Sequence, residues 1–419
     1  MKYLPHQTKA AAAAARIIEE HGLAYIFGEP RSGKTRAALL IAQPYERVIV
    51  FCPKMAIPGW VTEMDAVGIQ VEVTNYEQAG KVQGEHDLVV IDEAHQLGKV
   101  GKQTLRWKRL KKIVGDARVL YLSGTPAVET PLAIWSQLAL SKHTPLKYTD
   151  FYQFFRAWGI ADPIWLYGRQ VEQYKLAKPG LMAAVDHIFL RMSQQDAGIV
   201  HKAEDIIHTV KLGPDIKARI AGLIKDGIYS VVCLEGHNAD KLGGCVPPVY
   251  RVEHVRVESD MQERTSVHQL ESGAIKLPDG QIVMLDNNEV VDYLMATFGD
   301  TADVAYMTHF LSTRAKLAKH FTKAHLYSST AHAEGTDLSH YRHLVVVNSG
   351  YSGSKFIQRR ERGTNIKRLT PALVHHIITD GGVSAKVYAL TSEKLDFNLK
   401  AYRNERTGYP AGHHQIFDG

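Results

Sequence analysis

The sequence contains little cysteine and no long apolar run. Three cysteines in 419 residues, Cys52, Cys233 and Cys245, are too few for a disulfide framework and are typical of a protein in a reducing cytosol. No window approaches about 18 consecutive apolar residues, so we expect no membrane span. The first residues, Met-Lys-Tyr-Leu-Pro-His-Gln, contain no apolar core of the kind that secretory signals need. We therefore expect a cytoplasmic protein.

A large excess of charge of one sign is also missing. The chain has 50 Lys and Arg against 44 Asp and Glu, a net charge of +6, with 21 histidines in addition. This balance permits a polyanionic partner but does not prove one. Hydrophobic residues at 45% and charged residues at 22% are ordinary for a soluble globular protein. At about 150 residues per domain, the length predicts two or three domains.

Short apolar runs alternate with helical patterns in the first third of the chain. We expect a helix at 36–42 and strands at 23–28, 47–52, 87–92 and 117–123. Such runs predict a parallel sheet that is covered on both faces, with ligands at the carboxyl ends of its strands. The pattern resumes near residue 287, with expected helices at 290–298 and 312–321 and expected strands at 303–308 and 343–348.

The segment between the two α/β regions has a different pattern. From about Leu132 to Ile228 it is mostly helical and aromatic, and the aromatic residues of 148–158 have the helical spacing of a core, although they could also stack on bases. A β segment at 249–257 and a hairpin around Pro278-Asp-Gly280 follow. We therefore predict an α/β fold of two parallel-sheet lobes, 1–141 and 287–419, with an intervening mostly helical module and β-hairpin at 142–286.

A phosphate-binding loop follows the first expected strand. Gly28-Glu-Pro-Arg-Ser-Gly33-Lys34-Thr35 matches the pattern G-x-x-x-x-G-K-T between a strand and a helix. Its glycines let backbone N–H groups face phosphate oxygens, and the helix N-terminus adds positive potential. Lys34 then contacts the β and γ phosphates of ATP, and the Thr35 hydroxyl binds Mg²⁺. A chance match on a glycine-rich turn is the alternative, which the strand–loop–helix context disfavours.

Two adjacent carboxylates end another expected strand, in Val89-Val-Ile-Asp92-Glu93-Ala-His95. We expect Asp92 to hold Mg²⁺ and Glu93 to take the proton from the attacking water, because a metal keeps one carboxylate ionised while the other faces the water. The alternative is a polar helix start with Asp92 as the N-cap.

A cationic segment without acids follows these carboxylates. It contains Lys99, Lys102, Arg106, Lys108, Arg109, Lys111 and Lys112. Seven unopposed cations on a short segment can neutralise phosphates and release counterions, which favours a nucleic-acid contact. The alternative is a solvated helix face, which is what a run of charges usually is.

Two sets of histidines and cysteines carry no expected chemistry. The first set has a spacing that matches no familiar zinc finger, so we do not expect zinc there: Cys233, His237, Cys245 and His254. The pairs His375–His376 and His413–His414 are expected to be surface residues.

Taken together, these motifs resemble superfamily two helicases and translocases. The phosphate loop, Asp92-Glu-Ala-His95 and Ser123-Gly-Thr-Pro126 occur in the order of that superfamily. The finer resemblance is to its Swi/Snf-like branch, whose "P…L…W…E" and "GTP…N…ELW" segments are similar to 52–63 and 122–135, and whose segment ending in paired arginines is similar to Phe189-Leu-Arg191-Met. Residues 333–338 resemble "GGxGLNL", and 356–362 resemble the closing Q-x-x-x-R motif. The resemblance runs from about Leu4 to Arg368 and is typical of compact phage or bacterial relatives.

The resemblance implies two RecA-like lobes and a role for further residues. Gln7 would read the adenine edge of ATP, and Gly335 and Asp337 would contact the nucleotide from the second lobe. Arg362 would act as an arginine finger, and Asn365 stands where the family usually has a second arginine. Coupling between the nucleotide and nucleic-acid sites would fall to four residues, which are His95, Ser123, Thr125 and Gln358.

The implied function is an ATP-dependent DNA helicase or translocase that unwinds, branch-migrates or otherwise remodels single-stranded, forked or branched DNA. One alternative is a motor that moves on duplex DNA without separating its strands. Another is an ATP-dependent remodeller of a protein partner, which would use the same ATPase residues for a different substrate.

Overall fold

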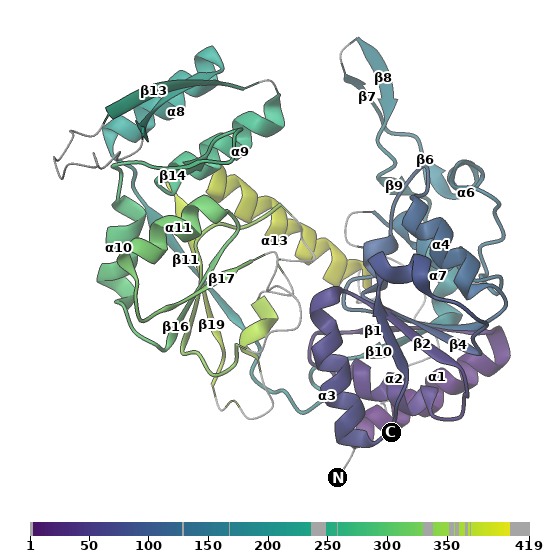
Figure 1. The fold of residues 1–419 in the computed structure, drawn as a ribbon. Coiled ribbons are helices and arrows are strands. Elements are labelled where there is room, and N and C mark those ends of the chain that lie inside the picture. Colours follow the sequence, from purple (N-terminus) through teal and green to yellow (C-terminus); the bar gives the residue numbers. More distant parts are fainter. Residues whose placement is uncertain are drawn as a thin grey trace, which may run out of the picture. The chain divides into compact units, whose positions relative to one another are not determined.

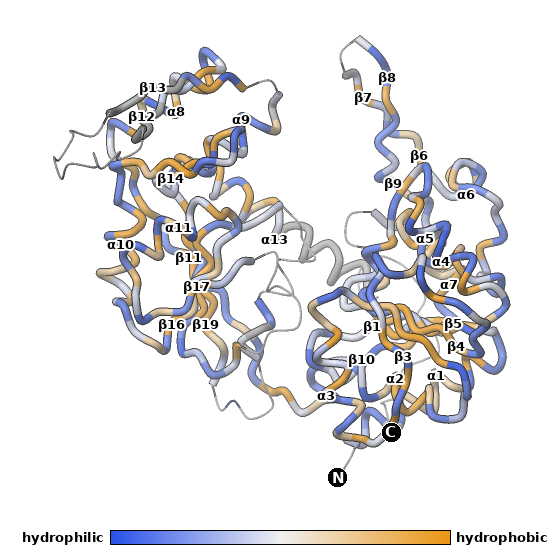
Figure 2. The backbone as a smooth tube through the Cα atoms, in the orientation of Figure 1, coloured by the Kyte–Doolittle hydropathy of each residue, from blue (hydrophilic) through white to orange (hydrophobic). Residues whose placement is uncertain are grey.

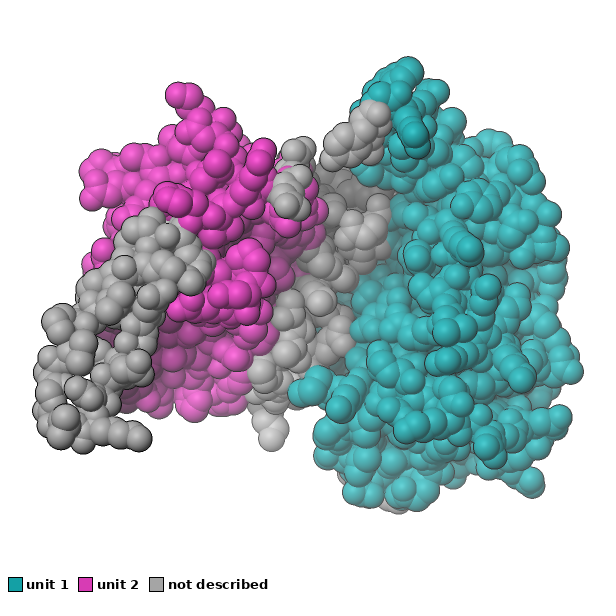
Figure 3. Space-filling view, turned by 45° about the horizontal axis from the view of Figure 1, so that its top comes forward, with its two compact units in different colours: residues 1–202, 364–369, 392–419 teal, residues 203–363, 370–391 magenta. Residues whose placement is uncertain are grey.

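The computed structural model describes residues 3–402, except for 128–129, 167, 236–248, 258, 330–337, 352–355, 357–359, 365–367 and 369. The chain divides into two compact units, coloured separately in Figure 3. Unit 1 consists of 1–202, 364–369 and 392–419, and unit 2 consists of 203–363 and 370–391. The segment 142–286 is therefore divided between them. Within the described part of the chain, no helix is long and apolar enough to cross a membrane.

Unit 1 is built on a six-stranded parallel sheet in the order β10-β1-β5-β4-β2-β3 (Figure 1). Its strands are β1 (Leu23–Gly28), β2 (Val48–Cys52), β3 (Glu72–Asn75), β4 (Leu88–Asp92), β5 (Arg118–Ser123) and β10 (Phe189–Met192). All residues of β2 and β4 are buried, as expected for strands that are covered on both faces. The four strands expected in this region are confirmed, and β3 and β10 were not expected.

The helices α1 (Pro5–His21), α2 (Lys34–Ala42), α3 (Ile57–Val67) and α4 (Leu105–Val114) belong to the same unit. The apolar character of its strands is visible in Figure 2. In α1 the small residues Ala10 and Ala14 and the larger Ile18 are fully buried and face the core of unit 1. The helix ends at Gly22, whose φ of 75° is left-handed and favours glycine.

The segment expected to be mostly helical contains many strands. Its helices are α5 (Ala133–Leu138), α6 (Phe151–Trp158), α7 (Leu181–Val185) and α8 (Pro214–Asp226). Four strands form two small antiparallel pairs, β6 (Gly159–Ile160) with β9 (Leu176–Ala177) and β7 (Pro163–Leu166) with β8 (Arg169–Glu172). The mostly helical assignment was therefore wrong, because strands of two to four residues are too short to show a period in the sequence. The core interpretation of the aromatic residues is confirmed for Phe151 and Phe154, which are buried against Trp135.

Unit 2 contains a five-stranded parallel sheet in the order β11-β19-β18-β16-β17. Its strands are β11 (Glu204–Val210), β16 (Val304–Thr308), β17 (His325–Ser328), β18 (His343–Val346) and β19 (Leu373–Thr379). Its helices include α10 (Glu289–Phe298), α11 (Leu311–His320) and the first part of α13 (Val383–Tyr402). The expected strands and helices from residue 290 to residue 348 are confirmed, as are two parallel sheets in one chain.

A smaller set of elements lies between β11 and α10 in the sequence. It comprises α8, β12 (Ile228–Glu235), β13 (Val249–Arg256), α9 (Asp260–Glu271), β14 (Ala274–Lys276) and β15 (Ile282–Met284). The expected hairpin is confirmed as the antiparallel pair β14–β15. Lys316 of α11, only 2% exposed, donates from Nζ to three carbonyls around this hairpin, those of Gly273 (3.0 Å), Leu285 (2.8 Å) and Asn287 (2.5 Å).

The histidine pair His375–His376 was wrongly expected at the surface, because both residues are buried in β19. Adjacent parallel strands place a short chain of imidazoles in contact: Nδ1 of His375 lies 2.8 Å from Nε2 of His208, and its Nε2 lies 3.0 Å from Nδ1 of His343. His413–His414 lie outside the described residues, as do His237 and Cys245. Among described residues, no group of three or more His, Cys, Asp or Glu could hold a metal ion.

Candidate functional site

The carboxyl edge of the sheet in unit 1 gathers the residues expected to carry chemistry. Gly28 ends β1, Ser123 ends β5 and Asp92 ends β4. The strand register aligns these ends, because Phe27 pairs with Ser123 and Asp92 pairs with Leu122. β5 lies between β1 and β4, so the phosphate loop and the acid pair lie two strands apart at the same edge.

The phosphate loop joins β1 to α2 through two left-handed residues. Arg31 has a φ of 63° and Gly33 a φ of 86°. Lys34 is the first residue of α2, and its Nζ donates to the main-chain carbonyls of Gly28 (2.7 Å) and Glu29 (3.1 Å). A Cβ added to Gly28 would lie 2.6 Å from the Lys34 side chain, so the lysine passes directly over this glycine. Its ammonium group therefore lies inside the loop.

The start of α1 holds the loop from one side. Nε2 of His6 lies 2.9 Å from the main-chain carbonyl of Ser32. Gln7, 4% exposed, accepts the N–H of Leu4 on its amide oxygen at 2.9 Å, while its amide nitrogen faces Gly33, where an added Cβ would lie 2.3 Å away. The residue expected to read adenine thus contacts the phosphate loop. The contact of His6 was missed, because no sequence pattern links it to residue 32.

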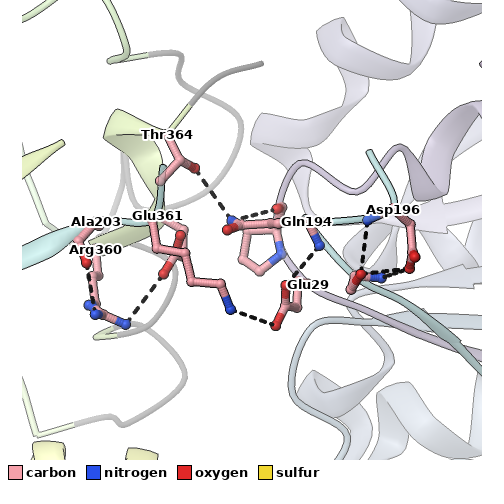
Figure 4. A network of polar contacts seen from close by, with 10 residues as sticks. Glu29, Gln194, Asp196, Ala203, Arg360, Glu361 and Thr364 are labelled. Carbon is pink, nitrogen blue, oxygen red and sulfur yellow. Dashed lines mark hydrogen bonds and ion pairs between the residues drawn. The ribbon is translucent and has the colours of Figure 1, made fainter. Parts of the chain in front are cut away.

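The residues after β10 hold the loop from another side (Figure 4). The main-chain N–H of Gln194 donates to the Glu29 carboxylate at 2.8 Å. Its side-chain amide donates to the Pro30 carbonyl at 3.0 Å and to Thr364 Oγ1 at 3.4 Å. Gln194 is 2% exposed. This support was also missed, because β10 was not expected and Gln194 lies just beyond its end.

Asp92 is a buried carboxylate with a donor on each oxygen. Oδ2 accepts the indole N–H of Trp60 at 2.9 Å, and Oδ1 accepts the main-chain N–H of Glu93 at 2.9 Å. The hydroxyl of Tyr76 donates to the main-chain carbonyl of Asp92. Burial, followed by the neighbouring Glu93, raises the pKa of Asp92 to about 7, and the positive charge of Lys34 acts in the opposite direction.

A polar chain connects the ends of β4 and β5. Glu93 adopts a left-handed φ of 51°, and its carboxylate lies 3.3 Å from Nδ1 of His95. The same Nδ1 lies 3.0 Å from Oγ of Ser123, which accepts the N–H of Thr125 at 3.0 Å. Three of the four expected coupling residues therefore form one contact chain that begins at Glu93. The fourth, Gln358, lies outside the described residues.

The expected second-lobe residues are described only in part. Gly335 and Asp337 lie outside the described residues. The backbone of Arg362 belongs to a 3-10 helix, Glu361–Gly363, in unit 2, and its side chain lies outside the described part. In the same unit the neighbouring Arg360 donates to the carbonyl of Ala203 at 2.9 Å (Figure 4). Arg360 also pairs with Asp205 at 2.7 Å.

The residues at this edge fit a magnesium ion bound together with a nucleotide. Mg²⁺ is usually held by one or two oxygen side chains, substrate phosphates and waters, so it needs no cage made by protein alone. Asp92 supplies a buried carboxylate at the end of β4. Thr35 follows Lys34 in α2 and supplies a hydroxyl. These two residues are the expected ligands.

The cationic segment lies on and before α4. Six of its seven cations are exposed, which are Lys99, Lys102, Lys108, Arg109, Lys111 and Lys112. Arg106 is half-buried instead: it pairs with Glu77 at 3.5 Å, donates to the Gln96 carbonyl at 3.3 Å and lies 5.4 Å from the centre of the Tyr76 ring. Arg106 therefore has partners within unit 1, and the exposed cations form the free face of the segment.

No known family model matches the chain, and no curated protein matches it either.

Proposed function

We propose that this protein is an ATP-dependent DNA helicase or translocase of superfamily two, with two RecA-like lobes of the Swi/Snf-like type. The observation that carries the proposal is the arrangement at the edge of the unit 1 sheet. A phosphate loop with Lys34 inside it lies two strands from the buried Asp92, at the same carboxyl edge of the sheet. A phosphate loop and an acid pair in this arrangement are what hydrolysis of a nucleoside triphosphate requires.

In the proposed reaction, the phosphate loop and Lys34 bind the β and γ phosphates, and Thr35 and Asp92 hold Mg²⁺. When bound there, Mg²⁺ would supply positive charge against the negative charge that develops on the phosphates. Glu93 accepts a proton from the water that attacks the γ phosphorus, while the bond from that phosphorus to the bridging oxygen breaks and ADP leaves. Glu93 has a left-handed backbone, and its carboxylate lies 3.3 Å from Nδ1 of His95.

The contact chain from Glu93 through His95 and Ser123 supports coupling between hydrolysis and movement. A change in the charge or position of Glu93 would alter its contact with His95. His95 would then change its contact with Ser123 at the end of β5. We infer the roles that the resemblance implies for four further residues, Gln358, Gly335, Asp337 and Arg362. Arg362 acts as the arginine finger.

The exposed cations of the α4 segment support a DNA partner. Lysine and arginine on one surface bind phosphates without reading sequence, which suits a motor that must move along DNA. Arg106 contributes less positive charge to this surface, because it is half-buried and pairs with Glu77.

Two alternatives share the same ATPase site. A motor on duplex DNA would displace a third strand from a triplex but would not separate the strands of a fork. A remodeller of a protein partner would be stimulated by that protein and not by DNA. The α4 segment favours DNA, because its exposed charges are all positive.

The test is hydrolysis of ATP by the full chain with single-stranded, duplex, forked and four-way DNA, and with RNA as a comparison. We expect DNA to stimulate hydrolysis, and Lys34→Ala and Glu93→Gln to abolish it. Lys81→Ala and Glu72→Gln are matched controls, because both residues are exposed and lie outside the site. A rate of ATP hydrolysis that is the same with and without every nucleic acid tested would contradict the DNA motor.

A further inference from the structure

The indole of Trp60 is buried beside the acid pair and has no part in the chemistry described so far. Trp60 belongs to α3, is 2% exposed and donates its Nε1–H to Oδ2 of Asp92 at 2.9 Å. The other oxygen, Oδ1, accepts the N–H of Glu93 at 2.9 Å. Asp92 itself is 9% exposed. The orientation of this carboxylate is therefore fixed by two donors, and only one of them is a side chain.

An indole N–H can donate a hydrogen bond but cannot accept one, so it is satisfied only by an acceptor. It therefore favours the carboxylate in its charged form and in one rotamer. Each carboxylate oxygen can accept more than one hydrogen bond, so the two donors leave a lone pair on each oxygen for a metal or its water. Because little water reaches Asp92, no solvent molecule would readily replace the indole if it were removed.

We propose that Trp60 is a positioning residue that holds Asp92 in the orientation needed to bind the Mg²⁺ of a bound nucleotide. The inference rests on the proposed function, since it assigns a role within that ATP site. Mg²⁺ demands near-ideal octahedral geometry, which makes it sensitive to the orientation of a ligand. Partners that orient a metal ligand typically contribute about 10- to 100-fold to metal affinity.

The simpler explanation is that Trp60 only packs α3 against the sheet. Its ring is part of the buried core of unit 1, so packing alone accounts for its burial. The two explanations predict different effects of removing the donor while keeping a ring. Loss of packing weakens nucleotide binding equally with and without metal. Loss of positioning leaves the affinity without metal unchanged and reduces only the gain in affinity that Mg²⁺ gives.

The experiment compares wild type, Trp60→Phe and Trp107→Phe. Trp107 is the matched control, because its indole is also buried and donates to the main-chain carbonyl of Ser136 and not to the acid pair. Equilibrium binding of a fluorescent, non-hydrolysable ATP analogue is measured in Mg²⁺ and in EDTA. We expect similar affinities in EDTA, and a gain on adding Mg²⁺ that is about 10- to 100-fold smaller for Trp60→Phe alone.

An equal gain from Mg²⁺ in Trp60→Phe and wild type would overturn the role of Trp60, as would an equal loss in both buffers. A wild type that binds the analogue in neither buffer would contradict the proposed function itself. If wild type binds the analogue with the same affinity in Mg²⁺ and in EDTA, Asp92 is not a metal ligand and the role of Trp60 is refuted. If Trp60→Phe does not fold, the test uses the indole N–H resonance of Trp60 in ¹⁵N-labelled wild type. This resonance should shift when Mg²⁺ is added to the protein with bound nucleotide, and an unchanged resonance would overturn the role of Trp60.

Discussion

Replacing Gly33 by alanine tests whether the start of α1 and the phosphate loop depend on each other. The substitution has two separate costs. A φ of 86° is strained for alanine, at about 1–2 kcal/mol. The added Cβ would also lie 2.3 Å from Nε2 of Gln7, so that side chain must move. Its hydrogen bond from the N–H of Leu4 would then be lost, at a further cost of about 1 kcal/mol.

Gly84 provides the matched control. Its φ of 88° is nearly the same, but nothing lies within 4 Å of an added Cβ. Gly84→Ala should therefore show the backbone cost alone, about 1–2 kcal/mol, and Gly33→Ala about 2–3 kcal/mol. The difference between the two variants isolates the contact with Gln7.

The assay is urea unfolding of the full chain, followed by circular dichroism, together with equilibrium binding of an ATP analogue. We expect Gly84→Ala to bind like wild type and Gly33→Ala to bind much more weakly, because its methyl group displaces the support of the loop. If the two variants were equally stable, Gln7 would not hold the loop. If Gly33→Ala also bound the analogue normally, this edge of the sheet would not be the phosphate site.

Three further outcomes are expected. Burial first, and neighbouring histidines second, lower the pKa of His375 to about 4, so between pH 6.5 and 4 the unfolded chain binds a proton that the folded chain excludes. The free energy of unfolding in urea should therefore fall by about 2 kcal/mol between pH 7.5 and pH 5 because of this residue, and the fall should be smaller in His375→Gln. Lys316→Met removes the ammonium donor from three carbonyls, of which that of Gly273 keeps the N–H of Leu285, so it should lower the free energy of unfolding by about 2 kcal/mol in the same assay, while the exposed Lys319→Met should change it little. Trp165→Ala, at a residue 74% exposed, should leave the melting temperature unchanged, whereas Trp135→Ala, at one 2% exposed, should lower it strongly; equal shifts would contradict the burial described.

The sequence predicted the central elements of both sheets, because their strands are continuous apolar runs. Residues 88–92 illustrate this: all five are buried, so the apolar pattern is unbroken until Asp92. The edge strand β3 has exposed and half-buried positions, and its polar sequence Glu-Val-Thr-Asn does not stand out. The buried histidines of β19 were misjudged, since an imidazole that finds partners on adjacent strands is as well satisfied inside as in water.

The candidate site was predictable where spacing along the chain carries the information. Lys34, Asp92 and His95 belong to short motifs, and the structure brings them to one sheet edge. The supports of the loop were not predictable in this way. His6 contacts the main-chain carbonyl of Ser32, and Gln194 bonds to the Glu29 carboxylate and the Pro30 carbonyl, so both act on residues far away in sequence that no short motif links to them.

The strand β10 has a consequence for how the protein is made. β1, which leads into the phosphate loop, lies between β5 and β10, yet β10 leaves the ribosome roughly 160 residues later. At typical rates of synthesis this delay is on the order of ten seconds. During that time one side of β1 has no neighbouring strand, and unpaired edges invite association with other chains. A fragment that stops before residue 189 would keep that open edge permanently, so recombinant versions of unit 1 should extend past Met192.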